Sequence, residues 1–240
     1  MTTKNFSLES IKIMKNNKFI VSFVFVAAVA LFAVPIIAQK KPVPKKFTTV
    51  GYFSDIAAGP ESGDFCCMAV YLAQSSDKTF ALVTLAQGDI FNPVLVEATT
   101  SGKDKRTVEF TLPDDNGDKL YRGTVSAAGF TVSQAGTKSV LKRRCASTYS
   151  DISLGSGGDL GGTEIFITDS GGTWWALVST AQGELGEPVL VKADVTGKNY
   201  EKIAFTLPDS DRKFTGVIGK TSLTLNEGGA KSVLKSKCYQ

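Results

Sequence analysis

Histidine is absent from all 240 residues of the sequence. Its absence excludes Ser-His-Asp and Cys-His catalysis and every zinc site that needs an imidazole ligand. Carboxylate catalysis of the glycosidase kind needs no histidine, but the carboxylates that both copies share, Asp55/Asp151 and Asp64/Asp159, stand beside Gly or Ser at strand entries, where Asp caps turns. We therefore expect no enzymatic activity, and we expect no cofactor. A carboxylate-dependent hydrolase is the weakest alternative.

A basic surface is also lacking in most of the chain. Of the 27 Lys and Arg residues, eight lie in residues 1–46, which leaves 19 basic against 22 acidic residues in the remainder. A protein that binds nucleic acid needs a basic face to neutralise phosphates. The charge distribution thus argues against a nucleic-acid partner.

Sustained helical periodicity is missing from residue 47 onward, and short runs rich in Val, Ile, Phe, Thr and Tyr recur between turn signals instead. This pattern is typical of an all-β protein with short antiparallel connections. Alternation in Lys202–Leu207 predicts that Ile203, Phe205 and Leu207 face a core. The other strands predicted in this half are Thr163–Thr168, Thr173–Thr180, Pro188–Val195, Lys213–Ile218, Ser222–Leu225 and Lys231–Lys235.

One stretch of about 33 residues occurs twice, as Ala81–Pro113 and again, 95 residues later, as Ala176–Pro208. A repeat of this kind indicates a tandem duplication. We divide the chain into repeat 1 (47–145) and repeat 2 (146–240). Each repeat of about 95 residues is predicted to form an antiparallel β-meander, either a small barrel or a flattened sandwich, because a sheet of seven or eight strands must hide its edges. The junction is short, so we expect the repeats to pack with approximate twofold symmetry.

The N-terminal part reads as an export segment. Residues 19–38 are 20 residues without a charge, preceded by lysines and closed by Ala38. Residues 1–38 are therefore predicted to be a signal peptide cleaved near Gln39 or, because the run is long enough to cross a bilayer, a signal anchor. Residues 39–46 form a Lys/Pro linker. We expect a secreted, periplasmic or cell-envelope protein, with membrane anchoring through residues 19–38 as the alternative.

Two features are candidates for binding. Trp174 and Trp175 are adjacent in a predicted strand and must face opposite sides. Trp175 aligns with Phe80 of repeat 1 and is assigned to the core, while Trp174 is a candidate contact for a ligand or partner, or packs between the repeats. No metal site is assigned, but Asp114, Asn116 and Asp118 offer the oxygen density of a weak calcium loop, which ordinary hairpin chemistry also explains.

The four cysteines of an exported chain favour disulfides. Cys145 and Cys238 end the two repeats at equivalent positions, whereas Cys66 and Cys67 align with Gly161 and Gly162. Because adjacent strand residues face opposite sides, the favoured pairing joins Cys66 and Cys67 separately to Cys145 and Cys238. The rival pairing, Cys145–Cys238 with Cys66–Cys67, requires adjacent cysteines to bond.

These observations favour an exported, non-catalytic tandem β protein that acts as a binding or structural module. The alternative is a barrel that carries a small apolar ligand in its interior. The expected partners are a protein, a glycan or an apolar small molecule.

Overall fold

The computed structural model describes residues 49–59, 63–145, 147–208 and 210–239. The predicted leader (1–38) and linker (39–46) lie outside the described residues. Within the described part of the chain, no helix is long and apolar enough to cross a membrane.

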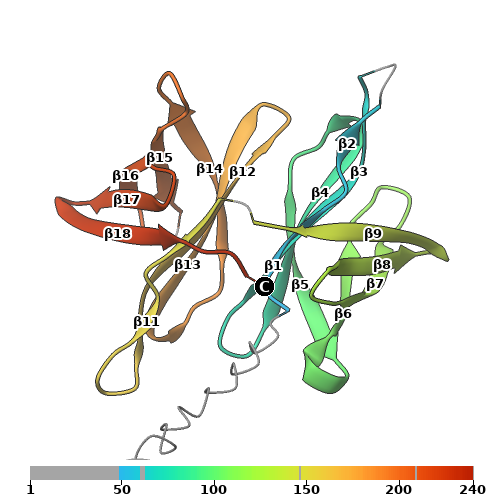
Figure 1. The fold of residues 1–240 in the computed structure, drawn as a ribbon, viewed down its shortest axis with the longest axis horizontal. Coiled ribbons are helices and arrows are strands. Elements are labelled where there is room, and N and C mark those ends of the chain that lie inside the picture. The colour runs from blue at the N-terminus through green and yellow to red at the C-terminus, as the bar shows by residue number, and fades with distance from the viewer. Residues whose placement is uncertain (1–48, 60–62, 146, 209, 240) are drawn as a thin grey trace, which may run out of the picture. The chain divides into compact units, whose positions relative to one another are not determined.

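Repeat 1 is a β-meander in which each strand from β2 to β8 pairs with the next one along the chain, while β1 pairs with β3 and β9 (Figure 1). The long strands β3 and β4 are buried on both faces over much of their length, and the last strand returns to the first. Its elements are β1 (Gly51–Ser54), β2 (Ala57–Ala58), β3 (Phe65–Gln74), β4 (Thr79–Ile90), β5 (Val94–Ser101), the 3-10 helix η1 (Lys103–Lys105), β6 (Thr107–Leu112), β7 (Lys119–Val125), β8 (Gly129–Gln134) and β9 (Thr137–Arg144).

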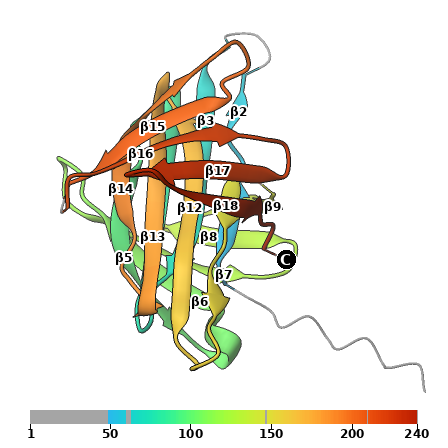
Figure 2. The same ribbon diagram turned by 90° about the vertical axis from the view of Figure 1, so that its left-hand side faces the viewer.

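Repeat 2 has the same order of strands. Figure 2 looks onto this repeat, where β12, β13 and β14 run as one set and β15, β16 and β17 lie across them. Its elements are β10 (Thr148–Ser150), β11 (Ser153–Leu154), β12 (Leu160–Ser170), β13 (Thr173–Leu185), β14 (Val189–Thr196), β15 (Lys202–Leu207), β16 (Arg212–Ile218), β17 (Ser222–Glu227) and β18 (Ala230–Ser236).

Both repeats close on themselves. In repeat 1, β1 pairs antiparallel with both β3 and β9, and in repeat 2, β10 pairs with both β12 and β18. The chain is therefore two similar closed eight-stranded antiparallel barrels in tandem, with the short β2 and β11 as additions at one edge. This confirms the all-β tandem fold, and it decides in favour of barrels.

The barrel interiors are filled by the residues that alternation assigned to them. Ile203, Phe205 and Leu207 lie in the core of the second barrel. In the first barrel the equivalent residues Val108 and Phe110 are buried, and the rings of Phe53 and Phe130 pack 5.8 Å apart. Eight short strands leave an interior that side chains fill, so the barrels hold their own cores.

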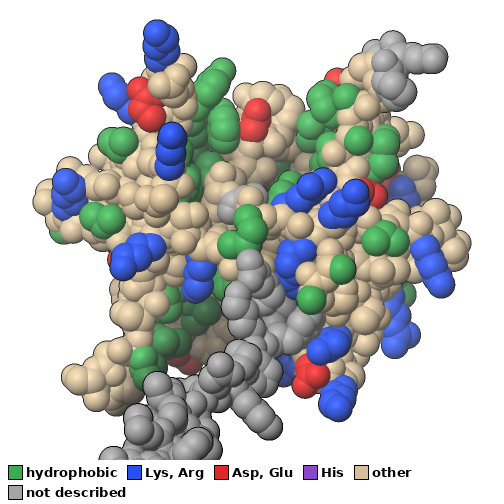
Figure 3. All heavy atoms as spheres, in the orientation of Figure 1, with side chains coloured by type: hydrophobic (Ala, Val, Ile, Leu, Met, Phe, Trp, Pro, Cys, Tyr) green, Lys and Arg blue, Asp and Glu red, His purple; other side chains and the backbone are tan. Residues whose placement is uncertain are grey.

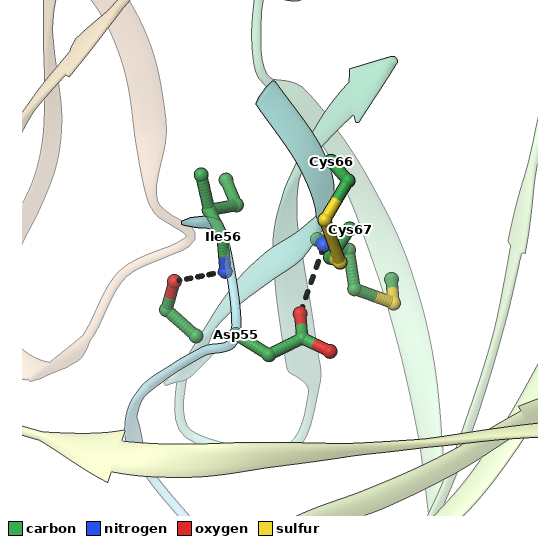
Figure 4. Close-up of a disulfide and its surroundings, with 6 residues drawn as sticks. Asp55, Ile56, Cys66 and Cys67 are labelled. Carbon is green, nitrogen blue, oxygen red and sulfur yellow. Dashed lines mark hydrogen bonds between the residues drawn. A yellow bond between two sulfur atoms is a disulfide. The ribbon is translucent and has the colours of Figure 1, made fainter. Parts of the chain in front are cut away.

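The sequence Ser-Asp-Ile occurs once in each repeat, at residues 54–56 and 150–152, and has the same structural role in both. Where β1 gives way to β2, Asp55 Oδ1 accepts a hydrogen bond from the Met68 N–H at 2.9 Å, while Ser54 Oγ accepts one from Ile56 (Figure 4). Asp151 Oδ1 accepts from Thr163 in the same way, at 2.6 Å. A carboxylate thus replaces a backbone carbonyl in the ladder. These two carboxylates have a structural role as acceptors.

The two barrels are joined through equivalent positions. The Tyr71 ring stacks on Phe166, its counterpart 95 residues on, with centroids 4.1 Å apart and planes 8° apart. Polar contacts repeat the symmetry, because Ser76 bonds the backbone of Leu185 and Ser170 Oγ donates to the Phe91 carbonyl. Residues that meet their own counterparts indicate the approximate twofold relation that the duplication predicts.

A polar network on Glu164 extends this junction. Glu164 accepts hydrogen bonds from the hydroxyls of Tyr71, at 3.2 Å, and Tyr239, and its Oε2 lies 3.3 Å from Lys237 Nζ. Arg143 Nη1 donates to the Tyr239 carbonyl at 3.2 Å. The chain's last described residues therefore tie repeat 2 back to repeat 1.

This network predicts a loss of stability at alkaline pH. Burial raises the pKa of Tyr71 and of Tyr239 well above the ordinary value, and the Glu164 carboxylate raises both further. An unfolded chain loses these protons near pH 10 while the folded protein keeps them. We expect the free energy of unfolding to be unaffected by them below pH 10 and to fall above it, by up to about 1.4 kcal/mol per pH unit for each tyrosine. Urea titrations at pH 8 to 11 measure it. An equal slope in Tyr239→Phe would contradict the role of Tyr239.

The disulfides correct the predicted pairing. Cys145 bonds Cys238, with Cα atoms 5.0 Å apart, and Cys66 bonds its neighbour Cys67. The favoured connectivity is thus wrong in the structure, and the rival pairing is present. Two physical reasons account for this. The twofold relation brings the equivalent ends of β9 and β18 together, and Cys67 has a φ of 86°, which breaks the strand alternation on which the prediction relied.

Tryptic mapping without reduction tests this connectivity. We expect peptide Cys145–Lys192 to be linked to Cys238–Gln240, and peptide Phe47–Lys78 to appear unlinked, about two mass units lighter than its dithiol form. The physical reason is that Cys145 and Cys238 lie within the Cα spacing that disulfides require. A crosslink from Phe47–Lys78 to either of the other peptides would contradict the structure.

Candidate functional site

The two tryptophans have exchanged the faces predicted for them. Trp174 packs against the core of the second barrel, with its ring 5.9 Å from that of Tyr200. Trp175 lies on the outer face, where Lys192 Nζ is 5.6 Å from its ring centroid. The alignment of Trp175 with Phe80 was sound, but Phe80 itself belongs to the apolar cluster between the barrels. The assignment of Trp175 to the core is therefore wrong, and Trp174 does not pack between the repeats.

The calcium candidate is the hairpin between β6 and β7. Asp114 Oδ1 accepts from the Asn116 N–H at 3.0 Å, and Oδ2 pairs with Lys119 Nζ. The Lys119 hydrogen bond, followed by the Asn116 amide, lowers the pKa of Asp114. Asp118 is exposed. Within the described ranges no group of three or more acidic, Cys or His side chains could hold a metal ion. The Asp114 oxygens serve the hairpin itself.

A cavity of about 610 Å³ lies beside this hairpin, at the end of the first barrel. We call it the mouth. Its floor consists of inward-facing apolar side chains, its wall of residues from β3, from the end of β4 and from the loop after β4, and its rim of polar side chains. The floor residues are Val83, Leu85, Val94, Leu112 and Tyr121. The wall residues are Cys67, Ala86 and Phe91, and the rim residues are Gln87, Asn92, Asp114, Asp115 and Lys119.

The mouth has the character of a ligand site. Cavities of about 300–1,000 Å³ with an apolar lining and a few polar groups are the usual binding sites for small molecules, and barrel mouths are a common place for them. Phe91 and Val94 are 50% and 39% exposed, although both are apolar. Burial raises the pKa of the Tyr121 hydroxyl.

The duplication supplies an internal comparison for the mouth. Leu85 and Phe91 of the first barrel correspond to Thr180 and Gly186 of the second, and Phe65 corresponds to Leu160. The vicinal pair Cys66 and Cys67 replaces two glycines. Two large apolar side chains of this mouth, Leu85 and Phe91, are therefore absent from the second barrel, which indicates that the scaffold does not require them.

Cys67 is held in a conformation that side chains rarely adopt. Its φ is 86°, and the equivalent Gly162 has a φ of 117°. Glycine takes such a conformation at little cost, whereas a residue with a side chain is strained. Figure 4 shows Cys66 and Cys67 beside the hydrogen bond that the Met68 backbone N–H donates to the Asp55 carboxylate. A strained cysteine in the wall of a cavity is the kind of outlier that accompanies function.

The second barrel supports the wall of the mouth. The hydroxyl of Ser170, the last residue of β12, donates to the backbone carbonyl of Phe91. This bond fixes the loop that presents the exposed Phe91 ring. The mouth thus depends on contacts from both repeats.

Sequence reasoning did not find the mouth. The signal was present in the alignment of the repeats, where Phe91 and the two cysteines stand opposite glycines. Only the fold shows that these positions, far apart in sequence, surround one cavity.

Basic side chains do not form a second obvious site on the visible face. In Figure 3, Lys and Arg side chains of the described residues are scattered among uncharged atoms and form no continuous patch there.

Comparisons with known proteins do not identify the chain. No family model matches the sequence, and no curated protein matches it. Two solved structures of the DNA polymerase sliding clamp from Pseudomonas aeruginosa, one of them with ligand, are 11% identical, and each match covers 77% of this chain. The chain spans 55% of the clamp chain, and the TM-score is 0.16. At that TM-score the match supports no conclusion.

Proposed function

We propose that the chain is an exported, non-catalytic binding protein that holds a small apolar molecule at the mouth of its first barrel. The observation that carries the proposal is the asymmetry between the repeats, because Cys67, Leu85 and Phe91 line the mouth where the second barrel has Gly162, Thr180 and Gly186. Exposed apolar side chains around a cavity lower the free energy when a ligand buries them.

The ligand sits in the mouth, not in the interior. The interior positions are taken by buried rings such as Phe53 and Phe130. An apolar body packs on Leu85 and Phe91, while the rim around Asp115 and Lys119 meets solvent and any polar group of the ligand.

Export is the second part of the proposal. The charge-free run of residues 19–38 and its flanking lysines support an export segment. Disulfides persist in oxidising compartments outside the cytosol, and all four cysteines of this chain are bonded. Intact-mass analysis of material exported by the natural host tests this part. A mature chain that begins at or near Gln39 is the expected result, and a chain that retains residues 19–38 in the membrane fraction refutes cleavage.

Native mass spectrometry of the same material tests the binding part. A retained small molecule that organic solvent releases supports the proposal. The protein can also be incubated with N-phenyl-1-naphthylamine, a neutral apolar probe. A bare protein mass before this incubation, with no adduct after it, favours a purely structural module.

A further inference from the structure

A second hollow lies on the outer face of the second barrel, apart from the mouth of the first. Its volume is about 640 Å³. We call it the outer groove. The groove lies where β14 and β15 separate. The two strands are eight and six residues long, but only three residues of each are paired, Asp194–Thr196 with Lys202–Ala204. Beyond those pairs the inward residues Val191 and Phe205 become visible in its floor.

Outward side chains of four strands line the outer groove in two rows. In one row Trp175 is the cross-strand partner of Lys192, and Thr206 is the partner of Lys213. In the other, Ala204 is paired with Thr215, next to Asp194. The groove therefore combines an aromatic ring, two ammonium groups, one carboxylate, two hydroxyls and a small residue that leaves space.

The aromatic ring keeps one unsatisfied polar group. Lys192 Nζ lies 5.6 Å from the Trp175 ring centroid, and Trp175 Nε1 is buried without a hydrogen-bond acceptor among the described residues. An indole N–H without an acceptor is unfavourable.

The same face of the first barrel is built differently. Register places Glu97 and Leu120 where the second barrel has Lys192 and Lys213. Glu109 and Arg122, which correspond to Ala204 and Thr215, form an ion pair at 3.6 Å that bridges β6 and β7. The net charge of this face is therefore negative in the first barrel and positive in the second. Where the first barrel has the Glu109–Arg122 ion pair, the second has the smaller Ala204 and Thr215.

We propose that the outer groove binds an acidic sugar, a pyranose that carries a carboxylate. Lys192 and Lys213 attract the carboxylate, the threonine hydroxyls match sugar hydroxyls, and Trp175 provides an apolar surface for the ring. A long polyanion such as nucleic acid does not fit, because residues 47–240 hold 22 acidic against 19 basic groups. This inference is independent of the mouth and of its apolar ligand.

Calorimetric titration of the full protein with trigalacturonate tests the inference, with maltotriose as the neutral counterpart. We expect saturable binding of trigalacturonate that weakens with salt, and at least tenfold weaker binding of maltotriose. Lys192→Glu/Lys213→Glu is expected to weaken trigalacturonate binding at least tenfold. Lys142→Glu/Lys235→Glu, which changes the net charge equally at exposed positions outside the groove, is expected to change it less than threefold.

A second variant tests the shape of the groove without changing the net charge. Ala204→Glu/Thr215→Arg rebuilds the ion pair of the first barrel and is expected to abolish binding, with an unchanged melting temperature. Three results would each overturn the inference. They are equal binding of both trisaccharides, no effect of either groove variant, and tighter binding of hexaglutamate than of trigalacturonate.

Discussion

Phe166→Ala is expected to lower the free energy of unfolding by about 3–5 kcal/mol, the usual cost of truncating a buried aromatic ring. Phe166 is 2% exposed, stacks on Tyr71 and lies 5.2 Å from the ring of Tyr52. Each of these partners belongs to the other barrel. The variant therefore removes the centre of the junction and leaves both barrel cores intact.

Urea unfolding measures this prediction, with Tyr200→Ala as the matched aromatic truncation. Tyr200 is 61% exposed, so its loss is expected to cost less than about 1 kcal/mol. A cost for Phe166→Ala as small as that of Tyr200→Ala would mean that the two barrels do not pack through this cluster.

Leu85→Thr/Phe91→Gly, which copies the second repeat into the first, is expected to weaken binding of N-phenyl-1-naphthylamine about 30- to 100-fold. Removing most of a leucine and a phenylalanine contact forfeits about 2–3 kcal/mol of apolar burial, and each 1.4 kcal/mol is a factor of ten in affinity. Both side chains line the mouth, and the second repeat shows that the fold accommodates Thr180 and Gly186 at these positions.

Fluorescence titration with the probe gives the affinities. The control is Leu154→Thr/Tyr200→Gly, which makes the same kinds of change at exposed positions of the second barrel, one of them at a φ of 54° that suits glycine. The control is expected to bind the probe as the natural sequence does. If both double variants lose affinity equally, the probe does not bind at the mouth.

The fold could be predicted from the sequence because residue alternation, turn spacing and the internal duplication all indicated the same architecture. Alternation in Lys202–Leu207 placed Ile203 and Phe205 correctly in a core, and the strands occur within a few residues of their predicted bounds. Short turns left only antiparallel neighbours. The duplication then repeated the result, and closure of the sheet followed from the need to cover its edges.

The site could not be predicted in the same way, because it depends on which face a residue occupies and on what a closed barrel brings together. Trp175 was assigned to a core because it aligns with Phe80, yet the neighbouring Ala176 is the residue that faces inward. The adjacent cysteines were treated as ordinary strand residues, and a φ of 86° at Cys67 is invisible in the sequence. Twofold packing also brings equivalent residues such as Cys145 and Cys238 together, and the predicted disulfide pairing did not take this into account.

The most direct measurement of the central claim is a map of backbone amide chemical shifts in the full protein as N-phenyl-1-naphthylamine is added. We expect the largest shifts on the amides of Cys67, Leu85, Phe91 and Leu112, which surround the mouth. The equivalent amides of Gly162, Thr180, Gly186 and Leu207 serve as an internal reference and should remain unshifted. Equal shifts in the two sets, or shifts confined to the second, would contradict a binding site at the mouth of the first barrel.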